Sequence, residues 1–241
     1  MDYLLLLSTI VLGAITVFSF RLHEPKHVKL LNSFTGAFLL SLTILHLLPE
    51  LYSFPAGQGG EKAALLLGGL MLGGFFIQLA LDFISMGVEH GHEHHVHGHA
   101  PYGVLAGLCL HALVEASALG NADTYYDKPS RTMLLWSIVV HNFPVSIALL
   151  GMLLHWGMKR GRALAWLGVF AAMGPLGMFV SGHMPLLANH SRELMAIVIG
   201  IFMHIATTIL FESGDVHRIH VPKLIAIIVG TTLGVAAVLL H

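Results

Sequence analysis

Charged residues are scarce in this chain of 241 residues, which is 10% Asp, Glu, Lys and Arg, 56% hydrophobic and has a mean hydropathy of +0.79. A soluble globular domain carries about 25% charged residues, so this composition excludes that class. The formal net charge of −1 offers no basic surface, and we expect no nucleic-acid partner. Cys109 is the only cysteine, so the chain cannot form a framework of internal disulfides.

Eight long apolar segments indicate an all-α integral membrane protein. A hydrocarbon core of about 30 Å needs roughly 20 helical residues, and the segments lack the polar–apolar alternation of half-buried strands. We predict an eight-transmembrane-helix bundle that forms a single transmembrane domain over residues 1–241, in an inner (cytoplasmic) or plasma membrane. The first segment has no basic residues before it, so we expect it to stay as a helix rather than be cleaved. The predicted spans are 2–20, 28–51, 62–88, 102–120, 132–157, 163–182, 193–212 and 222–240.

Lys and Arg residues are distributed unequally between alternate connections of this bundle. The connections after the first, third, fifth and seventh spans hold Arg21, Lys26, Lys29, Lys159, Arg160, Arg162, Arg218 and Lys223. The opposite side holds Lys62, Lys128, Arg131 and Arg192. Because positive residues accumulate on the cytoplasmic side, both termini are predicted outside, and the connection over residues 89–101 is predicted in the cytoplasm.

Metal-binding side chains occur in the middle of two apolar spans. His111 and Glu115 are one helical turn apart and share a face, and His141 lies in the next span, three residues before Pro144. Ionisable groups at membrane depth cost several kcal/mol unless they are paired or line a polar cavity. Pro144 cannot donate to the carbonyl of residue 140, so we expect a bend beside His141.

These side chains predict a site for a divalent transition metal. Two imidazoles, one carboxylate and a water or the Asn142 carbonyl suit four-coordinate Zn²⁺, although imidazole also suits other transition metals. We expect Zn²⁺, or else Fe²⁺, Mn²⁺ or Cd²⁺, as a transported substrate, and no organic cofactor. In the alternative interpretation, the histidines are packing residues that hydrogen-bond between helices. The sequence leaves the oligomeric state open, a homodimer included.

Further polar residues are candidates for a path for the ion; in the alternative interpretation, His46 and Glu50 are interface residues that only face water. His46 and Glu50 end the second span, Gln78 and Asp82 share a face of the third, and His204 lies in the seventh. His204 could add a ligand, but an interhelical hydrogen bond accounts for it more simply. The cytoplasmic connection holds a histidine tract that could bind metal loosely as a buffer or sensor. Its histidines are His90, His92, His94, His95, His97 and His99.

Three motifs resemble those of the ZIP (Zrt/Irt-like) metal transporter family. Residues 111–120, HALVEASALG, resemble the H-N-x-x-E/D-G signature of its fourth helix, and residues 141–149, HNFPVSIAL, resemble the H-E-x-P-x-E signature of its fifth helix. The second span ends in His46-Leu-Leu-Pro49-Glu50, like the family's H-L-x-P-E. The resemblance covers essentially the whole chain, and it implies inward transport by an alternating-access bundle.

The chain departs from the family pattern at the second of two adjacent metal positions. Where the family has an Asn, two acids and a sixth-helix Glu, this sequence has Ala112, Asn142, Val145 and Gly174. The resemblance therefore implies a single-metal variant that uses His111, Glu115 and His141, with Asn142 as an oxygen ligand.

Two other functions compete with metal transport. An intramembrane zinc hydrolase acting on lipid would need a third histidine, for which His204 is the candidate, but the sequence contains no H-E-x-x-H motif. A bis-histidine haem protein would place His111 and His141 on opposite sides of a porphyrin. Glu115, on the same helix face as His111, argues against the haem protein. We therefore expect a transporter rather than an enzyme.

Overall fold

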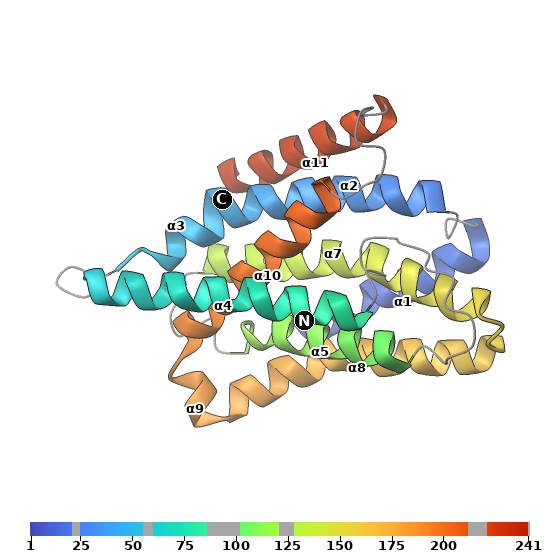
Figure 1. Cartoon of the computed structure of the whole chain (residues 1–241), viewed down its shortest axis with the longest axis horizontal. Coiled ribbons are helices and arrows are strands. Elements are labelled where there is room, and N and C mark those ends of the chain that lie inside the picture. Colours follow the sequence, from blue (N-terminus) through green and yellow to red (C-terminus); the bar gives the residue numbers. More distant parts are fainter. Residues whose placement is uncertain (21–24, 55–59, 86–101, 121–127, 212–220, 241) are drawn as a thin grey trace.

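The described part of the chain is almost entirely helical in the computed structural model (Figure 1), which describes all residues except 21–24, 55–59, 86–101, 121–127, 212–220 and 241. The prediction of an all-α bundle is confirmed. The helices are α1 (Asp2–Phe20), α2 (Pro25–Leu42), the π-helix η1 (Thr43–Leu47), α3 (Leu48–Leu51), α4 (Glu61–Ser85), α5 (Tyr102–Ser117), α7 (Lys128–His155), α8 (Arg160–His183), α9 (Pro185–Ala188), α10 (Ser191–Phe211) and α11 (Val221–Leu239).

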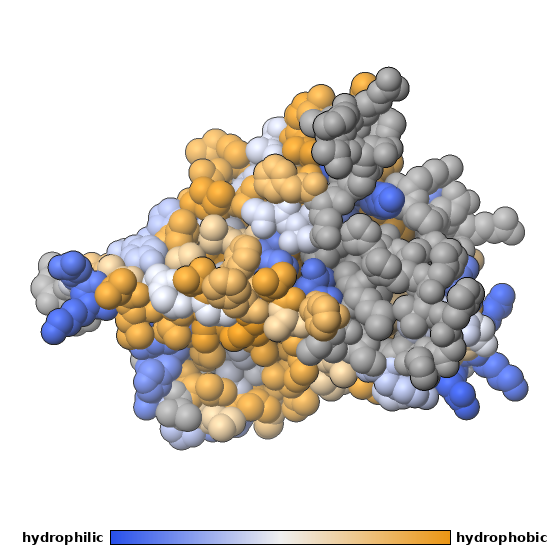
Figure 2. All heavy atoms as spheres, viewed as in Figure 1, coloured by the Kyte–Doolittle hydropathy of each residue, from blue (hydrophilic) through white to orange (hydrophobic). Residues whose placement is uncertain are grey.

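Seven of the described helical segments are long and apolar enough to cross a membrane. The fourth predicted span corresponds to α5, which ends at Ser117 and so is shorter than the predicted 102–120. The long helices run close to one direction, with α10 inclined among them (Figure 1). On the face shown in Figure 2, apolar residues predominate in the part drawn in colour, and strongly hydrophilic ones gather mainly toward the two ends of the long axis. This distribution fits a bilayer; the number of crossings and the side of the termini stay predictions.

A π-helical turn interrupts the second span, where the sequence predicted a regular helix. In η1 the N–H of Leu48 donates to the carbonyl of Thr43, five residues earlier. The widened turn ends two residues before Pro49, whose ring nitrogen carries no hydrogen to donate. Such π turns inside α-helices are frequent at functional sites, and this one carries His46.

The helices pack in two groups. In the first group α4 packs on α10, α11 packs on α2, and α10 also contacts α2. In the second, α5 packs on α8, and α1 packs on α7 and α8. The two groups meet mainly through the contacts of α4 with α5 and of α2 with α7. Both helices with the predicted metal ligands, α5 and α7, therefore belong to the second group.

Glycines allow the closest helix contacts within these groups. A Cβ atom on Gly74 would lie 2.0 Å from the carbonyl oxygen of Ile197, and one on Gly200 would lie 1.9 Å from that of Met71. At the α5–α8 contact, a Cβ on Gly177 would lie 2.1 Å from the carbonyl oxygen of Leu113. Backbones that approach this closely gain dispersion contacts where lipid provides no hydrophobic driving force between helices.

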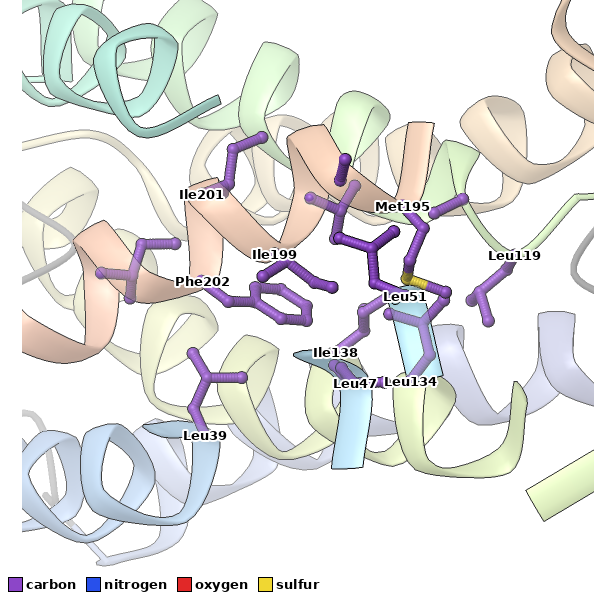
Figure 3. Packing of buried hydrophobic residues seen from close by; sticks show 14 of the residues in the cluster. Leu39, Leu47, Leu51, Leu119, Leu134, Ile138, Met195, Ile199, Ile201 and Phe202 are labelled. Carbon is purple, nitrogen blue, oxygen red and sulfur yellow. The ribbon is translucent and has the colours of Figure 1, made fainter. Parts of the chain in front are cut away.

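Two large apolar clusters, and a small third one of Phe38, Leu42 and Met133, fill the interior of the described part. The α10 cluster (Figure 3) includes Leu39, Leu47, Leu51, Leu119, Leu134, Ile138, Met195, Ile199, Ile201 and Phe202. The α8 cluster includes Leu105, Leu108, Ala112, Val145, Leu149, Leu150, Leu153, Ala163, Leu167 and Phe170. On α7 the α10 cluster ends at Ile138 and the α8 cluster begins at Val145, so His141 lies between them. In the same way, Glu115 on α5 lies between Ala112 of the α8 cluster and Ala118, which follows the end of α5 and belongs to the α10 cluster.

Candidate metal centre

His111, Glu115 and His141 converge on one point inside the bundle. One ligand atom from each residue can be chosen so that all three lie within 4.8 Å of one another. His111 and Glu115 are 0% exposed and His141 is 1% exposed. The α5 helix supplies His111 and Glu115, which are four residues apart, and α7 supplies the second imidazole. All three residues lie at the boundary between the two large apolar clusters.

The spacing of the donor atoms is close to that of a tetrahedral ion. The Nε2 atom of His111 lies 3.4 Å from the Oε2 atom of Glu115, and two ligands of zinc with bonds of about 2.0 Å are roughly 3.3 Å apart. The rings of His111 and His141 meet edge to face, with centroids 5.6 Å apart and planes at 84°. Only small side-chain movements would be needed to bring the three donor atoms within bonding distance of one ion.

The Gln78 side chain contacts His111 from a third helix. Its Oε1 atom lies 2.9 Å from the Nδ1 atom of His111, and Gln78 is 0% exposed. Sequence reasoning placed Gln78 along an ion path and missed this contact with His111. The available signal was a polar amide in the middle of an apolar span, at the depth of His111.

Asn142 and Pro144 complete the surroundings on α7. Asn142 is 4% exposed, and its Oδ1 atom accepts no hydrogen bond from the residues that the structure describes. This oxygen could therefore bind a metal ion, and its role as a ligand stays a prediction. The α7 helix continues through Pro144 as far as His155, so the proline does not end the helix beside His141.

His204 contacts Asp82 rather than the three converging ligands. The Nε2 atom of His204 lies 3.7 Å from the Oδ2 atom of Asp82 and 3.5 Å from the Thr208 hydroxyl. The Phe75 ring packs edge to face on His204 with centroids 4.8 Å apart. Among described residues, the group that could hold a metal contains two histidines, so no third histidine is assembled for the hydrolase alternative.

The remaining predicted residues lie away from the converging ligands or outside the described residues. His46 and Glu50 are half-buried, on η1 and α3 at the end of the second span. The Nε2 atom of His46 is buried without a hydrogen-bond partner among described residues. The histidine tract, from His90 to His99, lies outside the described residues.

A bundle of apolar helices around a buried set of nitrogen and oxygen donors defines a class of intramembrane metal-binding proteins. A model of the family described as ZIP Zinc transporter matches residues 100–241, which is more than half of the chain and includes His111, Glu115 and His141. The chain belongs to the ZIP family.

Curated relatives agree with this assignment. The chain is 30% identical over 139 residues to a protein named zinc transporter ZIP9 from Xenopus tropicalis, covering 54% of this chain and 44% of that protein. It is 29% identical over 125 residues to the zinc transporter ZIP9 of Macaca fascicularis, covering 48% of this chain and 53% of that protein. The matched region thus spans about half the length of these relatives.

Proposed function

We propose that this chain transports a divalent transition metal, principally zinc, inward across the cytoplasmic or plasma membrane. The observation that carries the proposal is the buried convergence of His111, Glu115 and His141. Membership of the ZIP family supports transport rather than enzyme catalysis. Relatives named zinc transporter support zinc as the substrate.

The donor set supports binding that is selective but reversible. Two neutral imidazoles and one carboxylate leave a bound divalent ion with a net charge near +1, and the Asn142 oxygen can complete four ligands without adding charge. Nitrogen donors disfavour Mg²⁺ and Ca²⁺, which prefer oxygen ligands. An ion that is incompletely neutralised leaves more readily, as transport requires.

The apolar clusters support alternating access. The ligands are almost fully buried, with the α10 cluster next to them in one direction along α7 and the α8 cluster in the other. Access from either side therefore requires one of these clusters to open. We propose His46 and Glu50 as outer contacts for the ion, and Gln78, Asp82 and His204 as polar contacts on the inner side. Asp82 lies one turn beyond Gln78, toward the predicted cytoplasmic histidine tract.

Metal uptake into proteoliposomes tests the proposal. We expect saturable influx of Zn²⁺ in the wild type, with Fe²⁺, Mn²⁺ and Cd²⁺ as competitors, and no saturable influx in His111→Ala. Uptake should fall as the external pH drops below about 6, because an imidazole must be neutral to bind metal and its reference pKa is about 6.5. Equal flux in the wild type and in His111→Ala would overturn the proposal.

A further inference from the structure

Gln78 is a buried amide in the middle of α4, whose neighbouring residues are overwhelmingly apolar. Its side chain is 0% exposed, and transferring an amide into an apolar environment is unfavourable unless the amide is hydrogen-bonded. The Oε1 atom of Gln78 lies 2.9 Å from the Nδ1 atom of His111. An amide oxygen can only accept, so Nδ1 is the nitrogen that donates.

This hydrogen bond determines which nitrogen of His111 can bind a metal. A neutral imidazole carries one N–H and one lone pair. With the proton on Nδ1, the lone pair is on Nε2, and Nε2 is the atom that lies 3.4 Å from the Glu115 carboxylate. The amide thus orients the lone pair of His111 toward the other ligands. Without an acceptor at Nδ1, the ring could rotate or carry its proton on Nε2, where it would block the metal.

We propose that Gln78 is a positioning residue for the metal ion, holding His111 in its metal-binding tautomer and orientation. This inference rests on the proposed function, because it assigns a role at the same site. Partners that hydrogen-bond the second nitrogen of a ligating histidine commonly change metal affinity by about 10- to 100-fold. A neutral amide orients the ring without adding a negative charge, whereas a carboxylate would increase both the basicity of the imidazole and the retention of the ion.

The position of Gln78 also connects metal affinity to the packing of the two helix groups. The three ligands come from α5 and α7, whereas Gln78 comes from α4, which packs on α10 in the other group. The hydrogen bond therefore crosses the contact between the groups. A movement that separates α4 from α5 would break this bond and weaken the binding of the ion.

Zinc uptake by Gln78→Leu and Gln78→Glu in proteoliposomes tests this role. Leucine has a similar size but no acceptor, so we expect KM to rise about 10- to 100-fold without a fall in Vmax. Glutamate keeps the acceptor and adds a charge, so we expect KM below that of the wild type and slower turnover. A wild-type KM in both variants, or a loss of Vmax in both with KM unchanged, would show a packing role and overturn the inference.

Cobalt binding to the purified protein in detergent gives a second readout that does not require transport. The d–d absorption of Co²⁺ is measured for the wild type, Gln78→Leu and His111→Ala, and the His111→Ala spectrum supplies the contribution of the other histidines. We expect the His111-dependent band to titrate at about 10-fold or more higher Co²⁺ in Gln78→Leu. An unchanged titration would overturn the positioning role.

The outcomes also separate this inference from the proposed function. If His111→Ala abolishes uptake while Gln78→Leu behaves like the wild type in both assays, the carrier site stands and the role of Gln78 fails. If His111→Ala transports zinc normally, the proposed function fails and the role of Gln78 fails with it.

Discussion

Two buried histidines in this bundle have different surroundings. His111 shares a point with a carboxylate and a second imidazole, whereas His204 faces a single carboxylate, Asp82, across the α4–α10 contact. A single acid is enough to stabilise a histidine between two helices, but it provides too few donors for a metal. An intramembrane histidine therefore indicates a metal site only when side chains from other positions add further ligands.

Replacing His111 or His204 with alanine should give the largest difference in zinc transport between the two histidines. We expect His111→Ala to lose more than about 100-fold in zinc affinity, because it removes a direct ligand, and losing only the hydrogen-bond partner of a ligand already costs up to about that much. His204→Ala should keep a KM close to that of the wild type and lose turnover instead. Zinc uptake kinetics measure both. Comparable increases in KM for the two variants would remove the distinction between the regions.

Glu115→Gln removes only the negative charge from the proposed metal ligands, and so measures what that charge contributes to zinc binding. The amide keeps the size of the side chain and an oxygen donor, but a bound ion then keeps its full +2 charge. A charge-assisted contact contributes about 1.5–3 kcal/mol, so we expect zinc affinity to fall about 10- to 100-fold. Isothermal titration with zinc checks this, with His111→Ala as the reference for binding elsewhere. Wild-type affinity would mean that Glu115 is not a ligand.

Two adjacent glycines on α4 test the helix contact that holds Asp82 against His204. A Cβ on Gly74 would meet the backbone of Ile197, whereas one on Gly73 meets nothing within 4 Å. We expect Gly74→Ala to destabilise the protein by about 1–3 kcal/mol through overpacking. Gly73→Ala should be neutral or slightly stabilising. Thermal unfolding in detergent measures both, and equal melting temperatures would contradict the packing described for α4 and α10.

The substitution with the smallest expected effect on stability and zinc transport breaks an ion pair away from His111 and His204. Asp2 on α1 pairs with Arg131 on α7, and both side chains are partly exposed. Partly exposed pairs contribute about 0–1 kcal/mol, so Asp2→Asn should shift the melting temperature slightly and leave the KM for zinc unchanged. A change in KM would show that the position of α1 affects the metal ligands.

Much of this architecture could be predicted from the sequence because apolar length is a local property. The helices and the shared face of His111 and Glu115 follow from residue spacing. Their convergence with His141 does not, because α5 packs on α8 and α4 rather than closely on α7. The end of α5 at Ser117 and the π turn at Thr43–Leu47 were not predicted, because they depend on local backbone geometry beside turn residues and a proline.

Contacts between distant spans could not be predicted from spacing. Gln78 and Asp82 lie on one face of α4, but Gln78 contacts α5 and Asp82 contacts α10. Which neighbour each residue meets depends on the rotation of α4 in the bundle. That rotation is set by close contacts such as the one between Gly74 and Ile197, which residue spacing within a single span does not determine.

Anomalous diffraction at the zinc edge from crystals of the zinc-loaded protein would locate the bound ion. We expect one peak in the bundle, about 2.0–2.2 Å from the Nε2 atom of His111, a carboxylate oxygen of Glu115 and an imidazole nitrogen of His141, with the Gln78 amide oxygen still hydrogen-bonded to Nδ1 of His111. Zinc bound only elsewhere, or bound to His111 through Nδ1, would contradict the proposed site.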